Sequence, residues 1–89
     1  MTAHKSHPDI VKRLRRASGH LDRVTKMIAE ESPCIEIAQQ LHAVINALSS
    51  AKTILVQDHI ENCLTEALEG RSSNVREKVQ EFKEITKYL

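Results

Sequence analysis

The chain has 89 residues, of which 40% are apolar and 2% aromatic, so we expect one small domain, residues 1–89, with a thin core. No apolar run approaches the roughly 18 residues of a membrane span, and no signal peptide is evident, which predicts a cytoplasmic protein with reduced thiols. The net charge is +1, but residues 1–27 hold seven basic and two acidic residues, which gives a basic end and an acidic body.

The first predicted element is an amphipathic helix that follows a flexible tail of residues 1–7. Pro8 suits its first turn. Its apolar residues recur at steps of three and four, and they are Ile10, Val11, Leu14, Ala17, Leu21, Val24 and Ile28. Gly19 lies inside this helix, where it costs about 1 kcal/mol relative to alanine, and a close contact with another helix or with DNA would explain it.

Basic residues gather on the side of this helix opposite the apolar stripe. They are Lys12, Arg13, Arg15, Arg16, Arg23 and Lys26, with His20 at the same spacing. Such a face predicts contact with nucleic acid phosphates, and a merely solvated helix surface is the alternative. The chain has neither a zinc finger nor a helix-turn-helix pattern, so any DNA binding is expected to use an oligomer's surface.

The second predicted helix begins after the break at Ser32-Pro33, with Ser32 as its cap and Pro33 as its first residue. It runs to Gly70 without glycine or proline, and its length of roughly 50 Å is too great for a small monomer to cover. A four-three register predicts a seam for a partner helix at positions 34, 38, 41, 45, 48, 52, 55, 59 and 62.

Cys34 and Cys63 are 29 residues apart on this helix, or roughly 43 Å, so they cannot bind one ion within a straight chain. A second copy packed antiparallel, crossing near Ala47 and Leu48, would place Cys34 of one copy beside His59 and Cys63 of the other. The sequence therefore predicts a homodimer with two shared sites.

A short third helix is expected after the turn at Gly70. Its apolar stripe is Val75, Val79, Phe82, Ile85 and Leu89. The fold class that follows is all-α, with a three-helix protomer in an antiparallel helical-bundle dimer.

His59 and Cys63 are four residues apart and so point from one face of the second helix. Two thiolates and one imidazole favour Cu(I), or Zn(II) when a fourth ligand is added. Glu77 or Glu81 on the third helix would orient the histidine. The alternative is structural, with each cysteine a small buried residue and the histidine merely hydrogen bonded.

The chain resembles the copper-sensitive operon repressor family over nearly its whole length. The resemblance rests on Arg13-Leu14-Arg15-Arg16-Ala17-x-Gly19-His20-Leu21, Met27-Ile28, Cys34, Gln39-Gln40-Leu41-x-Ala43-Val44 and His59-x3-Cys63. It implies a dimer of dimers that binds operator DNA and leaves it when an effector binds, so that efflux genes are expressed.

The copper-sensing branch of that family has the pattern C-x24-H-x3-C, which Cys34, His59 and Cys63 match. The resemblance also implies that Arg13 contacts DNA and that Glu77 orients the ligands. The second helix has one basic residue, Lys52, as a further DNA contact. Tyrosine often precedes the first cysteine of copper sensors, and Pro33 stands there in this chain.

Three other functions stay open at this stage. A nickel or cobalt sensor on the same scaffold would add His4 or His7 as a fourth ligand. A thiol sensor for persulfides or electrophiles would use Cys34 as its nucleophile, and a helical scaffold would bind no DNA. An enzyme is least expected, because no carboxylate pair or nucleophile–base pair stands out.

Overall fold

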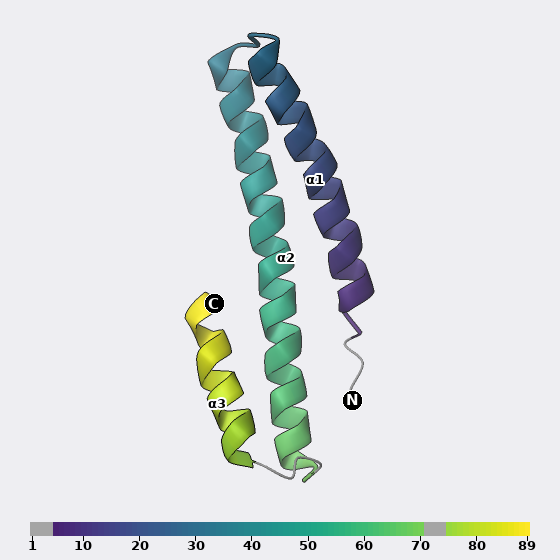
Figure 1. Ribbon diagram of the computed structural model, residues 1–89, viewed down its shortest axis with the longest axis vertical. Helices are drawn as coiled ribbons and strands as arrows, with labels where there is room; N and C mark the ends of the chain where they lie inside the picture. Colours follow the sequence, from purple (N-terminus) through teal and green to yellow (C-terminus); the bar gives the residue numbers. More distant parts are fainter. Residues whose placement is uncertain (1–4, 71–74) are drawn as a thin grey trace. The chain divides into compact units, whose positions relative to one another are not determined.

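The computed structural model of the chain describes residues 5–70 and 75–89. In these ranges it has three α-helices, α1 (His7–Ala29), α2 (Cys34–Leu68) and α3 (Val75–Ile85), a short 3-10 helix, η1 (Thr86–Tyr88), and no strand (Figure 1). The all-helical, three-helix prediction is therefore confirmed. None of the described helices is long and apolar enough to cross a membrane. The chain forms two compact units, Pro8–Lys52 and Thr53–Leu89, the latter with the residues up to His7.

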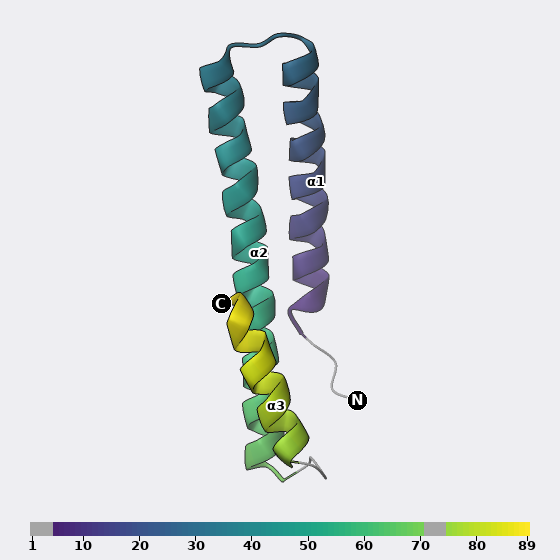
Figure 2. The same cartoon turned by 60° about the vertical axis from the view of Figure 1, so that its left-hand side comes forward.

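In the unit Pro8–Lys52, α1 and the first half of α2 run side by side as a helical hairpin (Figures 1 and 2). Apolar residues spaced seven apart on each helix are buried in it, and they are Ile10, Ala17, Val24, Val44 and Ala51. Seven residues are almost two helical turns, so each set forms one line along its helix. His20 Nε2 and Gln40 Oε1 lie 2.7 Å apart and join the two helices.

The apolar stripe predicted for the first helix is only partly covered within one protomer. Several large apolar residues of this hairpin keep exposed fractions of 39% to 59%, and they are Leu14, Leu21, Ile28, Leu41, Ile45 and Leu48. The last three belong to the seam predicted for a partner helix. Exposed apolar surface of this extent is typical of a chain that packs against another.

The turn between α1 and α2 closes with a Schellman motif, in which Ser32 N–H donates to Met27 O at 3.0 Å and Glu31 N–H to Ile28 O at 3.1 Å. Glu31 takes a left-handed conformation, with φ of 57°, where glycine is the usual residue. Pro33 O accepts the first backbone bond of α2, from Ile37 N–H at 3.1 Å. Pro33 is thus the capping residue, one position before the helical place predicted for it.

In the other unit, α3 packs along the second half of α2. Val56 and Cys63 are buried, and Phe82 and Ile85 are half-buried. Gly70 follows α2 with φ of 65°, which confirms it as the residue at which the helix stops. The rest of the predicted turn, residues 71–73, lies outside the described residues.

Candidate metal centre

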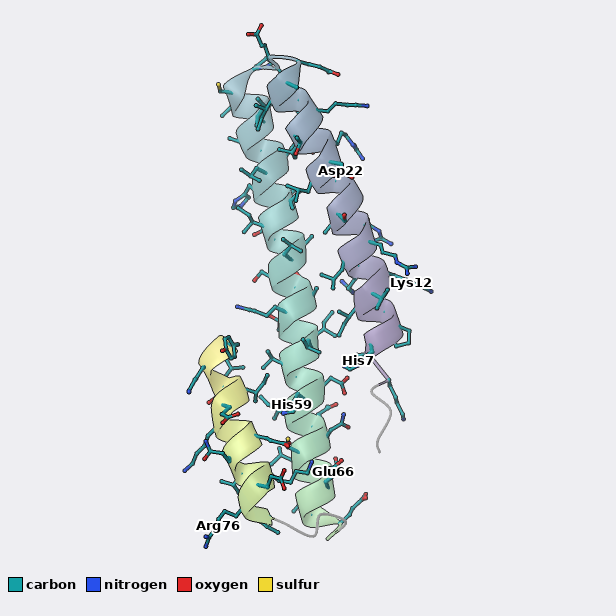
Figure 3. All side chains as sticks on the ribbon, in the orientation of Figure 1. His7, Lys12, Asp22, His59, Glu66 and Arg76 are labelled. Atoms are coloured by element: carbon teal, nitrogen blue, oxygen red, sulfur yellow. The ribbon has the colours of Figure 1, made fainter. Side chains whose placement is uncertain are left out.

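His59 and Cys63 face the same side of α2, as their spacing predicts. Cys63 Sγ lies 3.5 Å from His59 Nε2, and Cys63 is 6% exposed whereas His59 is half-buried. Figure 3 shows His59 on the side of α2 that faces α3. A histidine nitrogen and a cysteine sulfur are therefore adjacent and partly shielded from water.

Glu81 on α3 adds an oxygen to this pair. Its Oε2 lies 3.9 Å from Cys63 Sγ, and single ligand atoms of His59, Cys63 and Glu81 all lie within 4.8 Å of one another. Two donors bound tetrahedrally to one ion, at bond lengths of roughly 2.0–2.3 Å, are about 3.6 Å apart. The separations of the three atoms thus fit a shared transition-metal ion with little rearrangement.

The surroundings of Cys63 favour its protonated form. Burial raises the pKa of the Cys63 thiol above its ordinary value of 9.0, and the charge of Glu81 raises it further, while Lys78 opposes the shift. A bound metal needs the thiolate, so metal binding at this cysteine must displace a proton.

Lys78 holds Glu81 in place, and sequence reasoning missed this contact. Lys78 Nζ lies 2.9 Å from Glu66 Oε2 on α2 and 3.5 Å from Glu81 Oε2. The hydrogen bond with Glu66 raises the pKa of Lys78, so it remains a cation. The contact between Lys78 and Glu81 could have been predicted from their three-residue spacing on one helix, whereas the contact between Lys78 and Glu66 could not.

Among the described residues, the other predicted ligands, Cys34 and His7, are not members of this group. Cys34 is exposed at the first position of α2 and belongs to the unit Pro8–Lys52. His7 is exposed at the start of α1, and His4 lies outside the described residues. Glu77 is exposed one turn before Glu81, and of the two it is Glu81 that approaches the thiol.

The predicted basic face lies on the hairpin Pro8–Lys52. Its six proposed DNA contacts are all exposed, and they are Lys12, Arg13, Arg15, Arg16, Arg23 and Lys52. Lys12 extends from the outer side of α1, away from α2 (Figure 3). Arg13 Nε donates to Asp9 Oδ2 at 2.8 Å, which lowers the pKa of Asp9. His20 is half-buried against Gln40 and is not part of this outer face.

Comparisons with known proteins agree with this description. Residues 6–88 match the family described as metal-sensitive transcriptional repressor. A copper-sensing transcriptional repressor, CsoR, of Mycobacterium ulcerans is 37% identical over 60 residues, which are 66% of this chain and 51% of the relative. Another, RicR of Mycobacterium tuberculosis, is 39% identical over 57 residues, which are 64% of this chain and 59% of the relative. The chain thus spans little more than half the length of these relatives.

A solved structure is similar over the whole chain. The nickel-responsive transcriptional regulator InrS has a TM-score of 0.81 and 31% identity, and the match covers 100% of this chain and 99% of that one. The resemblance inferred from the sequence is confirmed. Because the family match takes in all the helices described above, the chain belongs to the family of metal-sensitive transcriptional repressors.

Proposed function

We propose that the protein is a Cu(I)-responsive repressor that binds operator DNA without metal and releases it when Cu(I) binds. The observation that carries this proposal is the pair of His59 Nε2 and Cys63 Sγ, 3.5 Å apart on one face of α2. With Cys34 they provide two thiolates and an imidazole, a donor set that suits three-coordinate Cu(I). The relatives named as copper-sensing repressors support the same ion.

Cys34 would come from a second copy of the chain. It is the first residue of α2, whereas Cys63 lies near the other end of that helix, and a helix rises about 1.5 Å per residue. An antiparallel partner would seat its α2 on the exposed seam residues Leu41, Ile45 and Leu48. A homodimer built in this way has two equivalent sites, and two dimers would form the homotetramer.

The basic face of α1 would bind the operator phosphates. Lys12, Arg15 and Arg16 are exposed on it and free of the α1–α2 packing. When Cys34 of one copy and His59 and Cys63 of the other bind Cu(I), the ion would hold the two α2 helices in a single packing arrangement. DNA release follows when that packing has the lower affinity for DNA, because the ion and the DNA then favour different states.

The test measures operator binding by fluorescence anisotropy, with and without Cu(I). The unmodified protein should bind the DNA of its own promoter and release it when Cu(I) is added. Cys34→Ala should bind the same DNA with unchanged affinity but fail to release it. His42→Ala is a matched control, because His42 is an exposed histidine of α2 away from the cluster. If the Cys34→Ala variant releases the DNA at the same Cu(I) concentration as the unmodified protein, the site assignment is wrong.

A nickel-responsive repressor on the same scaffold is the second candidate, favoured by the likeness to InrS. The Ser6 hydroxyl donates a hydrogen bond to the Asp58 carboxylate, the residue before His59, so the amino-terminal segment reaches the part of α2 that carries the site. In this alternative, His4 or His7 would supply the fourth ligand. A square-planar Ni(II) absorption band that is lost in a His4→Ala, His7→Ala double variant would favour nickel.

A thiol sensor for persulfides or electrophiles receives less support from the structure. Such a sensor needs a second thiol that becomes a thiolate at neutral pH. Cys63 is buried and its pKa is raised, and both features lower its reactivity.

A further inference from the structure

The carboxylate of Glu81 lies where an additional metal ligand would lie. Its Oε2 is 3.9 Å from Cys63 Sγ, and it belongs to the only group of three donor side chains that lie within 4.8 Å of one another in the described part of the chain. We infer that Glu81 is a direct ligand for divalent transition-metal ions at this site and is left out when Cu(I) binds. This inference rests on the proposed function in one respect, because the fourth donor is Cys34 of the second copy proposed there.

The orientation of Glu81 supports the role of a ligand. The oxygen that approaches Cys63, Oε2, is also the one held 3.5 Å from Lys78 Nζ. Lys78 in turn is fixed by its shorter contact with Glu66, at 2.9 Å. The carboxylate is thus directed at the thiol before an ion arrives, and Lys78 retains Glu66 as its partner when Glu81 binds the ion.

The donor chemistry predicts which ions recruit Glu81. His59, Cys63, Glu81 and the second copy's Cys34 supply two sulfurs, one nitrogen and one oxygen, which suits a tetrahedral Zn(II) or Co(II) ion. Cu(I) is satisfied by three soft donors and gains little from a carboxylate oxygen. Glu81 would therefore discriminate between the two classes of ion, and only a divalent ion would tie α3 to α2 directly.

The test compares affinities for Co(II) and Cu(I) in the full chain, by absorption spectroscopy and chelator competition. In Glu81→Gln we expect Co(II) affinity to fall at least about tenfold, with an altered ligand-field spectrum, while Cu(I) affinity changes less than about twofold. Glu61→Gln is the control, because Glu61 is an exposed carboxylate of α2 that does not belong to the donor group. It should leave both affinities unchanged. Glu81→His replaces one ligand by another and should restore tight Co(II) binding with a shifted spectrum.

Several outcomes would overturn the inference. One is a Glu81→Gln variant that keeps the Co(II) affinity and spectrum of the unmodified protein. Another is a variant that loses Cu(I) and Co(II) affinity by the same factor, because Glu81 would then support the site only through the fold. Should Glu81→Gln not fold, the Glu81→His spectrum decides, and a spectrum identical to that of the unmodified protein excludes ligation. Failure of the proposed function differs, since Cys34→Ala would then keep its Cu(I) response whatever residue occupies position 81.

Discussion

Gly19 lies in the middle of the basic face of α1. Arg15 and Arg16 lie four and three residues before it, and Arg23 lies four residues after it. All three are therefore its neighbours on the helix surface. A Cβ built at Gly19 would meet no described atom within 4 Å. Nothing in the described protomer therefore requires glycine at this position. The absent side chain leaves the helix backbone open at the centre of the proposed DNA contact.

Replacing this glycine should separate stability from DNA binding. Gly19→Ala should raise the free energy of unfolding by about 1 kcal/mol, because alanine favours the helix. It should also weaken operator binding at least about tenfold, since the added methyl group holds phosphates away from the backbone. Thermal unfolding and anisotropy measure the two effects. Ser18→Ala, at an exposed neighbour, is the control that should stabilise without changing DNA affinity. Unchanged DNA affinity in Gly19→Ala would show that DNA does not approach this part of the helix.

Cys63 predicts how metal affinity depends on pH. Its pKa is raised above 9.0, chiefly by burial, so the metal-free thiol holds its proton at neutral pH. Each thiol proton that metal displaces makes the apparent affinity rise about tenfold per pH unit. Chelator competition between about pH 6 and 8 should show this rise. Cys63 should contribute one displaced proton throughout the range. An affinity that is flat over this range would mean that the thiol is already ionised.

Glu31 has an unfavourable backbone conformation at the end of α1. Its φ of 57° is a left-handed conformation that costs a residue with a Cβ about 1–2 kcal/mol. Glycine avoids this cost but loses more entropy on folding, so Glu31→Gly should raise the free energy of unfolding by about 0.5–1 kcal/mol. Glu30→Gly, one residue earlier and without positive φ, should destabilise instead. Guanidinium unfolding of both variants checks the pair, and stabilisation by both or by neither would contradict this explanation.

At the scale of elements, periodicity predicted the three helices well. The three-four steps of the apolar residues and the stop at Gly70 gave α1, α2 and α3 close to their observed bounds. The capping at Pro33 differed by one residue, because a proline can stand at either of the first two positions and only the backbone bonds distinguish them. Sequence patterns fix helix phase better than helix ends.

Sequence reasoning was less able to divide a broad apolar stripe between two partners. Along α1, Ile10 and Ala17 are buried whereas Leu14 and Leu21 stay exposed, although all four belong to one predicted stripe. Periodicity shows that a face is apolar but does not show which neighbour covers each part of it. The same reason explains Glu81, since the sequence left Glu77 and Glu81 as alternatives and the observed packing of α3 brings Glu81 to the thiol.

At the scale of the whole molecule, two features of one protomer support the proposed dimer. Leu41, Ile45 and Leu48 are exposed on one helix, and the protomer's own cluster of His59, Cys63 and Glu81 does not include Cys34. The proposed antiparallel second copy would account for both features at once, because the same contact would cover the apolar seam and complete the metal site. The exposed apolar seam and the donor cluster thus predict that dimerisation and metal sensing depend on each other.

The most direct test of this shared site is complementation between two defective chains. Cys34→Ala and Cys63→Ala protomers should each fail to bind Cu(I) tightly when purified alone. A heterodimer of the two, isolated with different affinity tags after joint refolding, holds one intact site, built from Cys34 of one chain and His59 and Cys63 of the other. We predict one tightly bound Cu(I) ion per heterodimer. A heterodimer that binds no Cu(I), or a Cys34→Ala homodimer that binds it as tightly as the unmodified protein, would contradict a site shared between protomers.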